Sequence, residues 1–157
     1  MYIHIMKASD YDDGSKALFP LPCTCQSLRR LTRLVTRIYD RELRKADIEI
    51  TQFGLLTALA IVGEANQKTL SAGFAMDSTT LTRSLALLLK HRWIQVRPGK
   101  DRRERVFRLT EAGKRQILAA QSHWEEAERR LRDSMGRKDF RKLHSLVSEA
   151  TIAAAEE

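Results

Sequence analysis

The sequence predicts a mainly α-helical protein with one small β-hairpin. After residue 26, apolar residues recur at three- and four-residue steps, which is the spacing of amphipathic helices. The exception lies around Pro98 and Gly99, where two short apolar runs, 94–96 and 106–109, have the spacing of paired strands. With 157 residues, the chain is long enough for one domain with a substantial core.

Residues 1–26 are predicted to form a loosely ordered N-terminal arm, because they are polar, contain turn formers and show no lasting periodicity. A first helix is predicted within residues 27–50. Its apolar positions recur with helical spacing and are Leu28, Leu31, Leu34, Val35, Ile38 and Leu43.

A second helix is predicted over residues 52–62, with Thr51 as its N-cap and Gly63 as its stop. This helix is apolar on nearly every side, so it should be buried. A short third helix over residues 69–76 leads to Asp77, a good N-cap for a fourth helix whose leucines lie on one stripe.

The hairpin is followed by a long helix from Thr110, its predicted N-cap, to about Met135. Gly136 ends that helix, and a final helix follows. Two short helices followed by a hairpin predict a winged helix-turn-helix domain over residues 51–110. Helix one and the last two helices, in residues 111–157, carry apolar faces that so small a domain cannot cover. A second copy of the chain is the simplest partner for those faces, so these helices are predicted to dimerise.

The positive charge of the chain is concentrated in one region. The net charge is +8, and residues 83–115 hold 11 basic residues against three acidic ones, while the rest of the chain carries 17 of each. A concentrated positive field indicates a polyanionic partner, and we predict double-stranded DNA. RNA is a more distant alternative, because the aromatic residues of this region, Trp93 and Phe107, are placed for burial. A solvated basic face is the remaining interpretation.

Several classes of protein are disfavoured by the sequence. No run approaches the roughly 18 apolar residues of a membrane span, and the N-terminus lacks the features of a secretory signal. We therefore expect no membrane association and a cytoplasmic location, with Cys23 and Cys25 reduced. The four histidines are scattered, so neither a metal site nor another cofactor is predicted. The protein is not expected to be an enzyme, because no phosphate-binding loop, nucleophile elbow or catalytic triad can be found.

The solvent side of the fourth helix offers candidate DNA contacts. Short hydroxyl side chains and one arginine near a helix start suit base edges and phosphates in the major groove. These residues are Ser78, Thr79, Thr80, Thr82 and Arg83. Capping of the helix is the alternative role for Ser78 and Thr79.

Two motifs resemble those of the MarR family of bacterial transcription regulators. The first is the wing signature, an Asp-x-Arg pair followed by Leu-Thr-x-x-Gly, here Asp101, Arg103, Leu109, Thr110 and Gly113. The second is the segment MDSTTLTRSLALLLKHRWI, which is similar to the family's recognition helix. The resemblance covers roughly residues 27–155. It implies a homodimer, intertwined through helices one, five and six, that binds a pseudo-palindromic operator and usually acts as a repressor.

The resemblance also implies that Arg103 enters the minor groove, with Asp101 orienting it. A narrow, A·T-rich minor groove concentrates negative potential and attracts an arginine. Arg102 would contact the backbone or share the groove, and Arg97, Lys100 and Arg105 would neutralise phosphates. In the alternative reading, Asp101 and Arg103 only hold the hairpin together.

The family's regulators usually release DNA when a small, often aromatic, molecule binds, so the resemblance implies such an effector here. Tyr39, Phe53 and Trp124 are the candidates to line its pocket. Packing within the core is the alternative role for these three residues.

A thiol-based redox sensor is the alternative kind of regulator. Cys25 resembles the reactive cysteine of the family's organic-hydroperoxide repressors, and Tyr39 then matches one of two tyrosines that bind the thiolate, while Ile50 replaces the second. Arginines one turn away give Cys25 the electropositive surroundings in which reactive cysteines occur. Cys23 could resolve an oxidised Cys25, and two unreactive thiols are the other interpretation.

Overall fold

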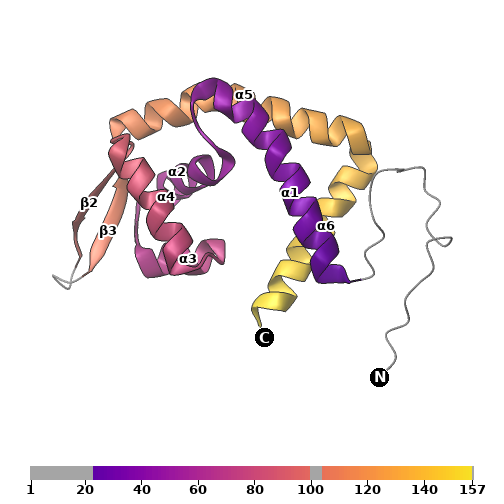
Figure 1. The fold of residues 1–157 in the computed structure, drawn as a ribbon, viewed down its shortest axis with the longest axis horizontal. Helices are drawn as coiled ribbons and strands as arrows, with labels where there is room; N and C mark the ends of the chain where they lie inside the picture. Colours follow the sequence, from indigo (N-terminus) through magenta and orange to yellow (C-terminus); the bar gives the residue numbers. More distant parts are fainter. Residues whose placement is uncertain (1–22, 100–103, 157) are drawn as a thin grey trace. The chain divides into compact units, whose positions relative to one another are not determined.

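The structure is a computed structural model, and it describes residues 23–99 and 104–156 (Figure 1). In chain order its elements are α1 (Thr24–Leu43), the 3-10 turn η2 (Arg44–Ala46), α2 (Ile50–Val62), β1 (Glu64–Asn66), α3 (Gln67–Phe74), α4 (Ser78–Lys90), β2 (Ile94–Pro98), β3 (Arg105–Leu109), α5 (Glu111–Met135) and α6 (Arg137–Ala155). The predicted fold class, mainly α-helical with a small antiparallel sheet, is confirmed. The chain divides into two compact units, one ending at Arg37 and the other beginning at Ile38.

The first helix starts earlier than its apolar pattern indicated. α1 begins at Thr24, and the backbone N–H of Ser27 donates to the carbonyl oxygen of Cys23 over 3.0 Å. This bond is the first of the helix, so Cys25 lies in the first turn of α1 and not in the arm that precedes it.

The second helix has a different cap from the predicted one. Glu49 and not Thr51 occupies the N-cap position of α2, and Gln52 Oε1 accepts a hydrogen bond from the Glu49 backbone over 3.1 Å. Asp40 Oδ1 accepts from the backbone N–H of Ile50 over 2.8 Å and satisfies a second helix-start donor. The cap was missed because an exposed glutamate is a rare N-cap and Thr51 is a common one.

Burial of α2 is less complete than its composition predicted. Leu55, Leu56 and Leu59 are fully buried, but Ile61 and Val62 are 83% and 58% exposed. The expectation of burial on every side is therefore wrong for the last turn before Gly63, which does end the helix as predicted, with a φ of 79°.

The predicted hairpin is part of a three-stranded antiparallel sheet in the order β1-β3-β2. Phe107 is the central partner in both ladders, opposite Ala65 of β1 and Val96 of β2. Phe107 and Ile94 turn inward and are each 2% exposed. The strand β1 was not predicted, because three residues of the sequence Glu-Ala-Asn are too short to show a period of two.

The core of the second unit lies between α2, α4, α5 and the inner face of the sheet. It is built from leucines of α2 and α4, with Phe107 and Ala120 closing it from β3 and α5. By contrast, none of the described residues of α6 is buried within the single chain. No helix in the described part of the chain is long and apolar enough to cross a membrane.

Candidate nucleic-acid interface

The helix α4 is amphipathic, and its start is fixed by the predicted cap. Leu81, Leu85 and Leu88 are buried, which leaves the opposite side of the helix in solvent. Asp77 Oδ1 accepts from the backbone N–H of Thr80 over 2.9 Å, and the Thr80 hydroxyl donates to Asp77 Oδ2 over 2.6 Å. These two hydrogen bonds hold the pKa of Asp77 below its ordinary value.

The solvent side of α4 carries side chains that are free to bind a partner. Ser78, Thr79 and Arg83 are exposed, and among the described residues none makes a hydrogen bond or ion pair with their side chains. Thr82 is exposed but engaged: its hydroxyl donates to the Ser78 carbonyl over 2.6 Å and accepts from Gln67 Nε2 over 2.8 Å. Because Asp77 already caps the helix, the hydroxyls of Ser78 and Thr79 are not consumed by capping.

The wing is the predicted hairpin of β2 and β3. Its strands pair as far as Gly99, whose backbone N–H donates to the carbonyl oxygen of Glu104 over 2.8 Å. Arg97 is half-exposed on β2 and forms an ion pair with Glu64 of β1. Arg105 is exposed, with its guanidinium carbon 5.7 Å from the centroid of the Phe107 ring. The other predicted wing contacts, Lys100, Asp101, Arg102 and Arg103, lie outside the described residues.

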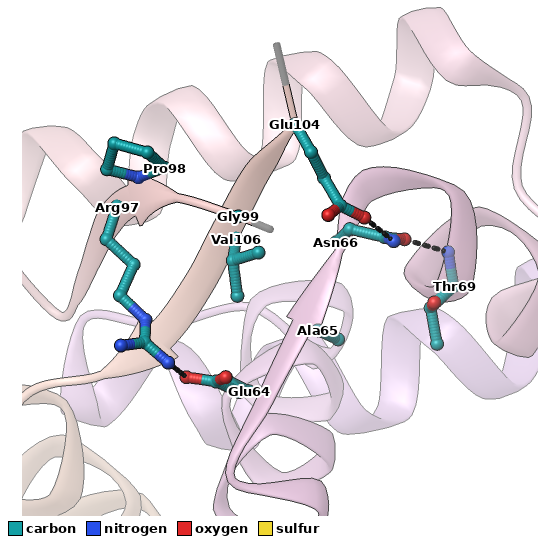
Figure 2. Close-up of a pocket in the computed structure, with 9 residues that line it drawn as sticks. All are labelled: Glu64, Ala65, Asn66, Thr69, Arg97, Pro98, Gly99, Glu104 and Val106. Carbon is teal, nitrogen blue, oxygen red and sulfur yellow. Dashed lines mark hydrogen bonds and ion pairs between the residues drawn. The ribbon is translucent and has the colours of Figure 1, made fainter. Parts of the chain in front are cut away.

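A cleft of about 550 Å³ lies beside β1 and the two wing strands. Figure 2 shows Arg97 reaching across it to Glu64, and Glu104 turned toward the side chain of Asn66. Asn66 uses both ends of its amide: Nδ2 donates to Glu104, while Oδ1 accepts from the backbone N–H of Thr69 over 2.7 Å and caps α3. Glu64, Asn66 and Glu104 were not predicted as site residues.

The Leu-Thr-x-x-Gly part of the wing signature fixes the exit from the wing. Leu109 is buried, and the Thr110 hydroxyl accepts from the backbone N–H of Gly113 over 3.0 Å, which caps α5 as predicted. The same hydroxyl lies 3.0 Å from the carbonyl oxygen of Trp93, to which it can donate. The start of α5 is thereby tied to the segment that links α4 to β2.

Of the three candidate effector-pocket residues, Tyr39 and Phe53 are core residues in the single chain, and Trp124 is half-buried. Tyr39 and Phe53 are each 7% exposed, and the Phe53 ring stacks on Trp124 with centroids 6.3 Å apart. Burial, together with a hydrogen bond to the Glu128 carboxylate, raises the pKa of the Tyr39 hydroxyl well above its usual range. The Tyr39 hydroxyl is therefore neutral, and the nearby Glu128 carboxylate favours this form.

The two cysteines are free thiols, and both are exposed. Cys25 lines a shallow groove on α1 together with Leu28, Arg29, Thr32 and Arg33. Within the described ranges, no three His, Cys, Asp or Glu side chains gather into a group that could hold a metal ion.

Comparison with known proteins bears on the fold and on this interface. No family model matches the chain. An uncharacterized HTH-type transcriptional regulator, YwoH of Bacillus subtilis (strain 168), is 26% identical over 83 residues, which are 53% of this chain. The chain spans 61% of the length of that curated relative.

Two solved structures of related fold contain DNA. The M. tuberculosis transcriptional regulator MosR, in complex with DNA, matches with a TM-score of 0.70 and 27% identity, over 83% of this chain and 98% of that one. A cysteine-to-serine mutant of MarR from E. coli, complexed with operator DNA, matches with a TM-score of 0.72 and 20% identity, over 80% and 91% of the two chains. The chain therefore has the winged helix-turn-helix fold of the MarR-family transcription regulators, and the resemblance predicted from its sequence is confirmed.

Proposed function

We propose that the protein is a homodimeric transcription regulator that binds double-stranded DNA through α4 and the wing. The free polar face of α4 carries this proposal, because two unengaged hydroxyls and the Arg83 guanidinium lie where a recognition helix meets base edges. The DNA present in the MosR and MarR complexes supports DNA as the partner. Binding DNA requires no reaction at these side chains, so we propose a regulator and not an enzyme.

The residues divide into those that read sequence and those that supply affinity. Arg83, with Ser78 and Thr79, is proposed to contact bases or adjacent phosphates in the major groove. Arg97 is proposed to exchange its ion pair with Glu64 for a phosphate, which is feasible because exposed ion pairs contribute little stability. The minor-groove role of Arg103, the orienting role of Asp101 and the backbone contacts of Lys100 and Arg102 stay predictions from the sequence.

A second copy of the chain is proposed to cover the apolar faces of α1 and α6. Leu28 of α1 is 49% exposed, and Leu146 and Val147 of α6 are 52% and 46% exposed. A two-fold dimer would present two copies of α4 to a pseudo-palindromic operator, with half-sites about one helical turn apart. Repression is part of the proposal, because a bound dimer blocks access to the DNA that it occupies. We also propose a cytoplasmic location.

The proposal is tested by selecting duplexes from a random-sequence library with the wild-type protein. We expect one enriched pseudo-palindrome, and Arg83→Ala should bind it at least about tenfold more weakly than the wild-type protein, with relaxed sequence preference. Arg141→Ala, which removes the same charge from exposed α6, should change the affinity by less than about twofold. Enrichment of no common sequence would overturn the proposal.

We further propose that a small aromatic molecule modulates operator binding. The half-buried Trp124, stacked on Phe53, offers an aromatic surface that such a molecule could extend. In a Trp93→Phe background, Trp124 is the sole indole, so titration with benzoate should quench its fluorescence and weaken operator binding together. Unchanged fluorescence with a panel of aromatic acids would contradict this role.

A further inference from the structure

Two adjacent residues at the junction of β1 and α3 bind the two elements proposed to contact DNA. The Asn66 side chain donates to Glu104, which lies just before β3 at the turn end of the wing, as Figure 2 shows. The next residue, Gln67, donates from Nε2 to the Thr82 hydroxyl of α4 over 2.8 Å. One rigid dipeptide thus holds the wing through Glu104 and the recognition helix through Thr82.

The junction itself is fixed on both sides. Asn66 closes β1, where it lies opposite Val106 of β3, and its Oδ1 caps α3 through the N–H of Thr69. A side chain that serves as an N-cap has little freedom, because moving it leaves a helix-start N–H unsatisfied. The amide nitrogen of Asn66 is therefore presented to Glu104 in one orientation.

The wing side of the contact is also shaped for it. A Cβ built on Gly99 would lie 2.3 Å from Glu104 Oε2 and 2.9 Å from Glu104 Cγ, so the Glu104 side chain occupies the space that any other residue at position 99 would need. Glycine at the turn lets Glu104 lie across the hairpin toward Asn66. The Glu64–Arg97 ion pair joins β1 to the other wing strand, which gives the wing a second tie to the same strand.

We propose that Asn66 and Gln67 are positioning residues that set the angle of the wing relative to the recognition helix, with Glu104 as the receiving group on the wing. This inference rests on the proposed DNA-binding function. DNA binding needs both elements in register, because α4 enters one groove while the wing approaches the adjacent one. Breaking the Asn66–Glu104 bond should leave the DNA contacts of α4 in place and weaken only those of the wing.

A matched pair of variants at Glu104 isolates the hydrogen bond from the charge. Glu104→Ala and Glu104→Gln remove the same negative charge, but only glutamine keeps an oxygen that can accept from Asn66. On the duplex selected by the wild-type protein, we expect Glu104→Ala to bind about tenfold more weakly than Glu104→Gln, the effect of one mismatched base pair. The logarithm of the affinity should also fall less steeply with the logarithm of the salt concentration for Glu104→Ala than for Glu104→Gln. The two slopes should differ by about one for each phosphate that the wing no longer neutralises.

A variant of Asn66 separates its two roles. Asn66→Ser keeps an N-cap oxygen for α3 but cannot reach Glu104, and it changes no charge. It should unfold at nearly the wild-type temperature and bind more weakly than the wild-type protein, which has the same charge. Its sequence preference should weaken only at the outer positions of the selected duplex, where the wing is proposed to bind. A uniform loss of preference at all positions would indicate a structural role and overturn the inference.

The outcomes distinguish the inference from the proposed function. Equal affinities of Glu104→Ala and Glu104→Gln would overturn the positioning role and leave DNA binding intact. If the wild-type protein selects no common duplex, the proposed function fails, and the positioning role fails with it.

Discussion

A Cβ atom placed on Gly113 would lie 2.1 Å from the carbonyl oxygen of Trp93. The Leu109 side chain would also lie within 2.7 Å of it. Three elements meet at this point, because Trp93 follows α4, Leu109 ends β3 and Gly113 lies in the first turn of α5. The glycine is required by close approach of backbone to backbone and not by an unusual φ.

Substitution of this glycine should destabilise the protein. Gly113→Ala forces the backbone of Trp93 to shift, and overpacking of this kind costs about 1–3 kcal/mol of unfolding free energy. Urea denaturation measures the loss. Gly73→Ala is the control, because a Cβ there meets no atom within 4 Å, so alanine should not destabilise the protein by overpacking. Equal stability of Gly113→Ala and the wild-type protein would contradict this packing.

Acid should weaken the contact between the end of α1 and α5. Glu42 is 1% exposed, accepts from Lys45, and lies 3.0 Å from the Arg130 guanidinium. The hydrogen bond from Lys45, aided by the charge of Arg130, holds the pKa of Glu42 below its ordinary 4.5. A lowered folded-state pKa means that this stability is present above pH 4.5 and is lost as the pH falls through the folded-state value.

The test compares two neutralised carboxylates. Glu42→Gln should lower the unfolding free energy at pH 7 by about 2 kcal/mol, the contribution of a hydrogen bond to a charged group. Its stability should then fall less than that of the wild-type protein as the pH is lowered below 4.5. Glu125→Gln, on the exposed side of α5, should leave both quantities unchanged. Parallel pH profiles of Glu42→Gln and the wild-type protein would contradict the role of Glu42.

Organic hydroperoxide should leave operator affinity within about twofold of its reduced value. Tyr39 is 7% exposed and interacts with the Glu128 carboxylate, so we expect its hydroxyl not to bind a Cys25 thiolate. Titrations of reduced, oxidised and dithiothreitol-treated protein measure the effect. A reversible loss of affinity in the wild-type protein that Cys25→Ser does not show would instead establish the redox sensor.

A carboxylate on the apolar side of α6 should dissociate the dimer. Val147→Asp would bury a charge in the proposed interface, which is costly without a partner group. Analytical ultracentrifugation should show a shift toward monomer. Ser148→Asp places the same charge on another side of α6 and should remain dimeric. If both variants sediment as the wild-type protein does, α6 is not part of the interface.

The sequence predicted the parts of the fold that repeat or are locally encoded. The leucine stripe of α4, its Asp77 cap and the Thr110 cap of α5 were all confirmed, because each depends on residues within one or two turns. The solvent-exposed side of α4 could be predicted for the same reason, because it lies opposite the buried Leu81, Leu85 and Leu88.

The junction residues could not be predicted in the same way. Asn66 and Thr69 have the spacing of a helix cap, which was a usable local signal for α3. The partner of Asn66 in the wing, however, is 38 residues away in the sequence and is brought near by the pairing of β1 with β3. A strand of three residues has no periodicity to reveal that pairing, so neither β1 nor the role of Glu104 could be inferred from the pattern.

The central claim is tested most directly by one equilibrium measurement. The wild-type protein is titrated against the duplex it selects, and against a duplex of the same length and composition in shuffled order, in about 0.15 M salt. We predict that the selected duplex binds at least about a thousandfold more tightly, with two-fold symmetric protection of its half-sites. Equal affinity for the two duplexes would contradict sequence-specific recognition and leave a basic surface with no operator.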